Sequence, residues 1–169
     1  SPGDSFGNAV QLRSTTIGKD GTLGKDIPLD LRACSCCQTS AAITEDGTVL
    51  IAYRDRTADE IRDISIVRRH NEVWSGPVNV HADGWEISGC PVNGPAIDAQ
   101  ATDAVVAWFT GADNIATVKV AFSEDSGVTF GPAFQVDSGE SVGRVGTLML
   151  ATGDALISWV EWTSDGEVL

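Results

Sequence analysis

Short runs of alternating apolar and polar residues occur along most of the chain. Val118, Val120 and Phe122 alternate with small or polar neighbours, and Ile64 and Ile66 flank a serine. A period of two is typical of a β-strand, because successive side chains of a strand point to opposite faces. Asp-Gly pairs separate many of these runs, and both residues tolerate turn conformations. No stretch predicts a convincing helix, so the pattern indicates an all-β chain.

The strand pattern also repeats along the chain. Residues 49–53 (VLIAY) match residues 104–108 (AVVAW), and residues 155–159 (ALISW) form a third copy. A Gly-Pro pair at 76–77 recurs at 131–132 with the same offset as the first two copies. Each unit is predicted to contain four antiparallel strands, which is the make-up of one blade of a β-propeller.

One motif in the second repeat is specific. Residues 123–130 read SEDSGVTF and fit the pattern S-x-D-x-G-x-T-[W/F]. This motif resembles the Asp box of sialidases and related propellers, and the resemblance implies a structural hairpin away from the active face. An aspartate can accept bonds from turn amides, and a glycine can adopt a positive φ. The matching residues are Ser123, Asp125, Gly127, Thr129 and Phe130.

The repeats predict a single partial propeller. Residues 39–82 and 95–138 are expected to form complete blades, residues 146–169 an incomplete blade, and residues 1–13 the last strand of a preceding blade. The resemblance to sialidases implies a six-bladed ring, of which this chain supplies about half. Either the chain is part of a longer protein, or a second copy of it closes the ring.

The formal net charge is −13, which excludes the clustered cations that nucleic-acid binding requires. The acidity is typical of a soluble protein, with a calcium or cationic-ligand site as the alternative. No apolar run is long enough to span a membrane. An even number of cysteines suits disulfides, and therefore an extracytoplasmic location.

Four cysteines form the most unusual group of residues. Strand parity places the loops at 32–38 and 86–94 on one face, because each precedes a blade. We expect the cysteine in the second loop to lie near the three in the first. The interpretations are a disulfide, with the other two cysteines paired or free, or a metal or copper-type thiolate site. No other cofactor is expected. The cysteines are Cys34, Cys36, Cys37 and Cys90.

The resemblance to sialidases implies further residues on the same face. Sialidases hold the substrate carboxylate with an arginine cluster, which pairs with it bidentately, and use an Asp acid/base with a Tyr–Glu pair. In this sequence Arg32, Arg54 and Arg144 are the candidates for the arginine cluster. Asp55 is the candidate acid/base, and Glu161 is the candidate partner carboxylate.

Other features of the sequence depart from that catalytic set. Tyr53 is the only tyrosine and aligns with the tryptophans of the other repeats, so it is predicted to be a packing residue. The charged residues of the strings RDR (54–56) and RD (62–63) are alternatively expected to pair across their loop.

Three functions therefore compete. The first is a glycan hydrolase, and the second is a non-catalytic propeller that binds glycan or protein through exposed aromatics such as Trp85 and Trp162. The third is a thiol or metal site at the cysteines.

Overall fold

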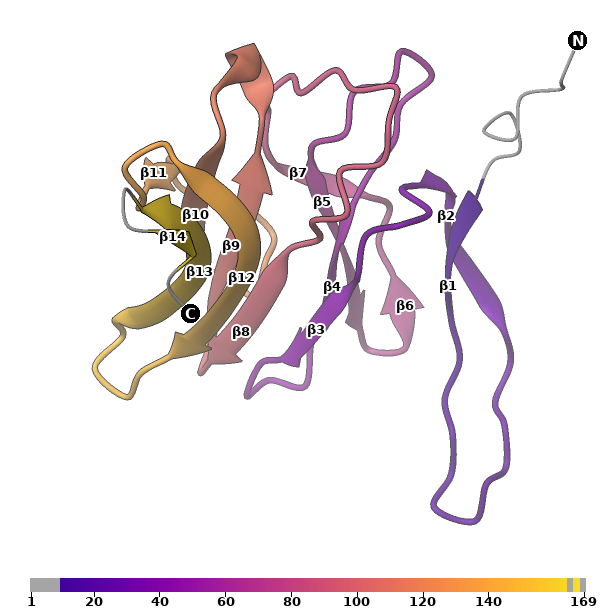
Figure 1. Cartoon of the computed structure of the whole chain (residues 1–169). Helices are drawn as coiled ribbons and strands as arrows, with labels where there is room; N and C mark the ends of the chain where they lie inside the picture. Colours follow the sequence, from indigo (N-terminus) through magenta and orange to yellow (C-terminus); the bar gives the residue numbers. More distant parts are fainter. Residues whose placement is uncertain (1–9, 164–165, 168–169) are drawn as a thin grey trace, which may run out of the picture.

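A computed structural model of the chain describes residues 10–163 and 166–167. Within these residues the chain is all-β, as predicted, and the strands form four antiparallel sheets. The helical content of the described part is one 3₁₀ turn, Ala112–Asn114, and nothing in it is a helix able to cross a membrane. The sheets follow one another in chain order from the indigo end to the yellow end (Figure 1).

The first two sheets come from the N-terminal half of the chain. Strands β1 (Val10–Ser14) and β2 (Ile27–Ala33) form a hairpin. The second sheet has the order β3-β4-β5, with the short strands β6 and β7 both pairing with β5. Its strands are β3 (Ser40–Ile43), β4 (Val49–Arg54), β5 (Ile64–His70), β6 (Val73–Trp74) and β7 (Val78–His81).

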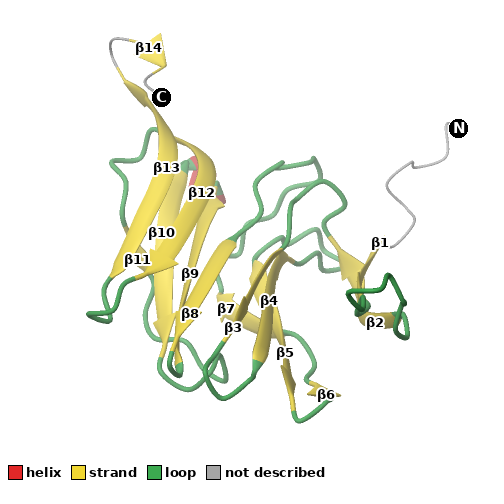
Figure 2. Cartoon of the chain, turned by 90° about the horizontal axis from the view of Figure 1, so that it is seen from below, coloured by secondary structure: helices red, strands yellow, loops and turns green. Residues whose placement is uncertain are grey.

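The other two sheets continue the series, and Figure 2 shows all of them from below. The third sheet has the order β11-β10-β9-β8 and the fourth the order β12-β13-β14. The strands of the third are β8 (Ala96–Gln100), β9 (Asp103–Thr110), β10 (Thr117–Ser123) and β11 (Phe134–Gln135). Those of the fourth are β12 (Ser141–Met149), β13 (Ala155–Thr163) and β14 (Gly166–Glu167).

Two segments differ from their predicted form. Residues 1–9 of the predicted N-terminal strand lie outside the described residues, and β1 pairs with β2, a strand that the repeat pattern did not predict. The position of residues 140–146 before a blade, and of residues 161–165 within one, predicts loops, but residues 141–146 lie within β12 and residues 161–163 within β13. Gly143 and Arg144 have positive φ values of 91° and 57°, and the pairing of β12 with β13 shifts register around them. This irregularity explains why the segment looked like a loop in sequence.

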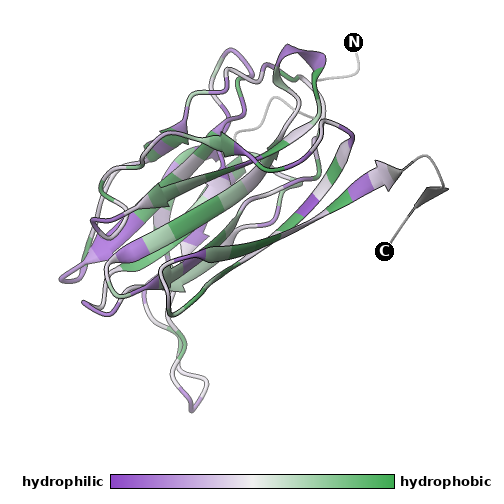
Figure 3. Ribbon diagram, turned by 90° about the vertical axis from the view of Figure 1, so that its left-hand side faces the viewer, coloured by the Kyte–Doolittle hydropathy of each residue, from purple (hydrophilic) through white to green (hydrophobic). Residues whose placement is uncertain are grey.

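Apolar side chains fill the space between successive sheets. The largest cluster joins the second and third sheets and contains Leu50, Ile66, Val106 and Trp108, all 0% exposed. Smaller clusters join the hairpin to the second sheet and the third sheet to the fourth. Hydrophobic segments accordingly lie in the central strands, whereas hydrophilic ones concentrate in the turns (Figure 3). The second and third sheets are therefore covered on both faces. This agrees with their central strands, which carry apolar residues on both faces.

Tight turns gather at one end of the sheets, which we call the turn end. It contains residues 44–48, 100–103 and 123–130. Glu45 N donates to Ala101 O at 2.9 Å, and Ser126 N donates to Thr102 O at 2.8 Å. The first bond ties a turn of the second sheet to a turn of the third, and the second bond joins two turns of the third sheet.

The Asp-box hairpin shows why its residue types are needed. The carboxylate of Asp125 accepts from the amide and the hydroxyl of Thr129 at 2.9 and 2.7 Å, and Ser123 Oγ accepts from Gly127 N at 2.9 Å. Gly127 has φ +75°, and a Cβ there would lie 2.9 Å from Leu50 of the neighbouring sheet. The hairpin is thus shaped to pack against that sheet.

Candidate functional site

The longer loops meet at the opposite end of the sheets, which we call the loop end. At its centre is Arg54, the last residue of β4, which is 1% exposed. Its Nε, Nη1 and Nη2 donate to carbonyl oxygens of Asn93, Arg62 and Phe109 at 2.7, 2.6 and 2.6 Å. Its guanidinium also lies over the ring of Trp85, 4.9 Å from the centroid. One buried side chain therefore joins two loops and the end of β9, and burial lowers its pKa.

The cysteines lie beside this arginine. Cys36 forms a disulfide with Cys90, with a Cα–Cα distance of 6.2 Å. Cys34 and Cys37 are free, and Cys34 Sγ lies 3.6 Å from Cys36 Sγ. Cys34 is buried, whereas Cys90 is exposed. The expected proximity of Cys90 to the triplet is present in the structure, with one disulfide and two free thiols.

The surroundings of Cys34 favour its thiolate. The Cys37 thiol donates a hydrogen bond to Cys34, and this bond is the main reason that the pKa of Cys34 falls to about 5. Arg62 Nη1 also lies 3.6 Å from Cys34 Sγ, and the Arg62 side chain is almost fully buried. The same hydrogen bond and burial raise the pKa of Cys37. These contacts favour the thiolate form of Cys34 and the protonated form of Cys37.

The same sulfur atoms bear on metal binding. The Sγ atoms of Cys34, Cys36 and Cys37 all lie within 4.8 Å of one another. Thiolates in a tetrahedral zinc site are about 3.8 Å apart, given Zn–S bonds of about 2.3 Å. The spacing thus suits a soft ion, but a sulfur that is bonded in a disulfide has no thiolate to offer. The chain with its disulfide intact presents only two of these three ligands.

The three arginines of the predicted cluster each have their own hydrogen-bond partners. The nitrogens of Arg54 are engaged by backbone carbonyls, which favours a structural role for this residue. Arg32 is exposed, and its Nη1 lies 3.5 Å from Thr57 O. Arg144 is also exposed, and its Nη1 donates to Val92 O at 2.9 Å. Arg54 and Arg144 therefore both bond to carbonyl oxygens of the segment 92–93.

The two predicted carboxylates lie on different sheets. Asp55 follows β4, accepts from Ser65 Oγ at 3.0 Å, and has its pKa raised by burial. Glu161 lies on β13 and accepts from Trp159 Nε1 at 2.6 Å. No hydrogen bond in the described part of the chain connects Asp55 with Glu161.

The two candidate aromatics differ from each other. Trp85 is buried rather than exposed, because it packs edge-on against Phe109 at 5.6 Å and lies under Arg54. Trp162 is 53% exposed, as predicted for a binding aromatic. Trp85 therefore helps to hold the loop end together and presents little surface to a ligand.

The charged residues of the 54–63 loop do not pair with one another as the alternative prediction for the strings 54–56 and 62–63 expected. Arg56 and Arg62 both bind Glu60, at 2.6 and 2.9 Å. Asp63 instead accepts from the backbone amides of Gly84 and Trp85, both at 3.0 Å. The contact of Arg62 with Cys34 was not predicted from the sequence. The only sign of it was that strand parity places the loops of both residues at the same end of the sheets.

Comparison with known proteins finds similarity among solved structures. No protein-family model matches the sequence, and no curated protein matches it. Among solved structures, the chain is similar to the "Hadza microbial sialidase Hz136", with a TM-score of 0.48 and 12% sequence identity over 76% of this chain. The match covers 32% of that chain, so the present chain spans about a third of its length. The activity in that name is a property of that protein.

Proposed function

We propose that the loop end is a thiol–disulfide redox centre in which Cys34 is the attacking sulfur. The observation that carries the proposal is the distance of 3.6 Å between the free Cys34 Sγ and the bonded Cys36 Sγ. Exchange requires a thiolate next to a disulfide sulfur, and both are provided within one loop. Arg62 lies against the attacking sulfur and supplies a positive charge.

The exchange step is internal and balanced. Cys34 Sγ forms a bond with Cys36 Sγ while the bond between Cys36 and Cys90 breaks, and Cys90 leaves as a thiolate. The number of disulfides stays at one, so this step needs no oxidant. Cys90 is the exposed cysteine of the pair, and it can then attack a low-molecular-weight disulfide to form a mixed disulfide and release one thiolate. The disulfide bond thereby moves from Cys36 and the exposed Cys90 to Cys36 and the buried Cys34, which leaves Cys90 free to react.

Peptide mapping tests the exchange directly. The chain is held at pH 7, alkylated, and digested with trypsin, which releases peptides 33–54 and 70–119. Exchange predicts a fraction of peptide 33–54 with an internal disulfide, together with peptide 70–119 alkylated at Cys90. Cys34→Ser should abolish this fraction, and Cys37→Ser should retain it. Absence of the fraction from the native chain, or a stoichiometric metal ion on four reduced thiols, would overturn the proposal.

Glycan hydrolysis is the competing function, implied by the Asp-box resemblance. It would use Asp55 and Glu161, which come from the second and the fourth sheet. Turnover of a fluorogenic sialoside by the native chain, lost in Asp55→Asn, would favour hydrolysis over the thiol centre.

We also propose that the sheets are propeller blades, completed by further chain or by a second copy. The support is that apolar side chains lie uncovered on the two outermost sheets. Leu31 is 64% exposed on the first, and Leu148 and Leu156 are 53% and 56% exposed on the last. Native mass spectrometry distinguishes a closed dimer from a monomer, and a monomer would exclude closure by a second copy.

A further inference from the structure

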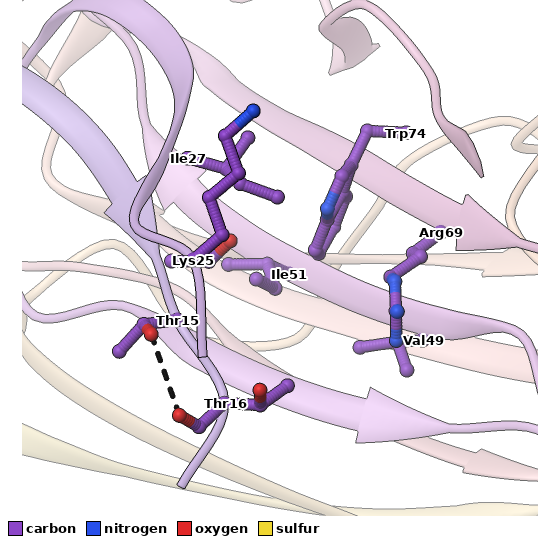
Figure 4. A pocket seen from close by; sticks show the side chains of 9 residues that line it. Thr15, Thr16, Lys25, Ile27, Val49, Ile51, Arg69 and Trp74 are labelled. Atoms are coloured by element: carbon purple, nitrogen blue, oxygen red, sulfur yellow. Dashed lines mark hydrogen bonds between the residues drawn. The ribbon is translucent and has the colours of Figure 1, made fainter. Parts of the chain in front are cut away.

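A groove lies between the N-terminal hairpin and the second sheet, at the turn end of the molecule. Residues 25 and 27 of the hairpin line one side, and strands β4, β5 and β6 supply the floor and the other side. The groove has a volume of about 300 Å³, at the lower end of the range for small-molecule sites. Figure 4 shows Ile51 between Lys25 and Ile27 on one side and Trp74 and Arg69 on the other.

The floor of the groove is apolar and carries an aromatic ring. Ile27, Ile51 and Trp74 are all half-buried, and Trp74 also packs on the cluster between the hairpin and the second sheet. An indole offers a broad flat surface at a low cost in conformational entropy, and it attracts flat apolar ligands. The floor therefore suits a ligand with a flat apolar body.

The charged residues in the groove are all cations, on a chain whose net charge is −13. They are Lys25 and Arg69. Asp26, the carboxylate next to Lys25 in sequence, is held away by Arg13 at 2.9 Å. No hydrogen bond or ion pair to Lys25 is found among the described residues. Arg69 pairs with Glu72, which is 82% exposed at its side chain. A local excess of positive charge on an acidic protein selects an anion.

We propose that this groove binds a small aromatic carboxylate, with its ring on Trp74 and its carboxylate between Lys25 and Arg69. The site goes beyond the thiol centre and is separated from it by the length of the strands. The groove involves the start of β2 and β4, whereas Cys34 follows the end of β2 and Arg54 is the last residue of β4. Binding here is therefore independent of the oxidation state of the cysteines.

Calorimetric titration of the chain with phenylacetate, and with its uncharged amide phenylacetamide, tests the proposal. We expect phenylacetate to bind with a Kd of about 1 mM, as fits a ligand of its size, and the amide to bind about tenfold more weakly. Lys25→Met should weaken phenylacetate binding about tenfold, because a charged hydrogen-bond donor is lost. Lys19→Met, a change in the same hairpin outside the groove, is the matched control and should have no effect.

Glu72→Gln sharpens the test, because it removes the carboxylate that competes for Arg69. This variant should bind phenylacetate more tightly than the native chain and leave the affinity for the amide unchanged. Equal binding of the acid and its amide, equal effects of Lys25→Met and Lys19→Met, or no heat of binding would each overturn the proposal. Alkylation of the cysteines should leave all these affinities unchanged, so a failure here is distinct from a failure of the thiol centre.

Discussion

The second and third sheets share a plan but differ at their two ends. Tyr53 on β4 and Trp108 on β9 occupy matching repeat positions, and both are fully buried. Each donates a hydrogen bond to a carboxylate from the segment that precedes its sheet: Tyr53 to Asp30, and Trp108 to Asp83 at 2.7 Å. The repeat thus retains more than an apolar pattern, because it includes an aromatic donor and its acceptor.

The difference begins one residue later. Arg54 follows Tyr53 and ties the loop end together, whereas the apolar Phe109 follows Trp108. At the turn end the relation is reversed, because the third sheet carries the full Asp box, whereas residues 71–74 (NEVW), at the corresponding place in the second sheet, lack its aspartate and glycine. The strands of the two sheets therefore form a common scaffold, and each sheet carries its distinctive side chains at a different end.

The largest expected effect is at Arg54. Arg54→Met leaves three carbonyl oxygens without their buried donor, so we expect it to lower the free energy of unfolding by 3 to 5 kcal/mol, roughly. Phe109→Leu, at the matching position, should cost about 1 kcal/mol, because it keeps most of the apolar volume. Urea denaturation of both variants measures the contrast. Equal losses would mean that Arg54 acts as packing and not as a cross-link.

The aromatic donors should come next. Tyr53→Phe keeps the ring but removes the donor to Asp30, and we expect a loss of about 2 kcal/mol in the free energy of unfolding. The loss should shrink in an Asp30→Asn background, because the charged acceptor is then gone. If the two changes are additive in a double-mutant cycle, the hydrogen bond contributes nothing to stability.

The Asp box should contribute less, because its turn is exposed. Asp125→Ala removes acceptors of two bonds from Thr129 and is expected to cost about 1 kcal/mol of stability by thermal denaturation. Its neighbour Glu124 is the control, and Glu124→Ala should change the stability by less than about 0.5 kcal/mol. A similar result for the two variants would contradict a structural role for the aspartate.

The smallest effect concerns acid and the 54–63 loop. The hydrogen bond from Arg56, aided by Arg62, lowers the pKa of Glu60 from 4.5 to about 2. Because the folded pKa is depressed, this contribution to stability is present above about pH 4.5 and is lost as the pH falls toward 2. Glu60→Gln should flatten the pH dependence of unfolding in this range. Asp113→Asn, in the matching loop of the third sheet, should leave it unchanged.

The strands were predictable from the sequence, because the alternation of apolar and polar residues reflects which side chains of a strand pack against the neighbouring sheets. The predicted ranges 39–82 and 95–138 enclose the strands of the second and third sheets. Closure of the sheets into a ring stays a prediction. Strand β2 was missed, because it belongs to no visible repeat. The loop-end grouping followed from strand parity, which brought Cys90 to Cys36.

The side-chain chemistry of the site was harder to predict. Sequence shows that arginines and carboxylates share a loop, but not which of them pair, since pairing depends on burial and side-chain direction. Glu60 illustrates this point. It pairs with both Arg56 and Arg62, although it belongs to neither of the two charged strings, 54–56 and 62–63. The burial of Trp85 was hidden for the same reason, because its cover comes from Arg54 and Phe109 on other segments.

The disulfide between Cys36 and Cys90 joins residues 54 positions apart, and every strand of the second sheet lies between them. That sheet is therefore contained in a covalent ring, which removes about 4 kcal/mol worth of chain entropy from the unfolded state. A protease cut within the ring would leave two pieces still linked through sulfur. If exchange moves the bond to Cys34, the ring opens, and the same cut would release the pieces. Which two of three sulfur atoms are bonded would then decide whether a nicked and unfolded molecule behaves as one polymer or as two.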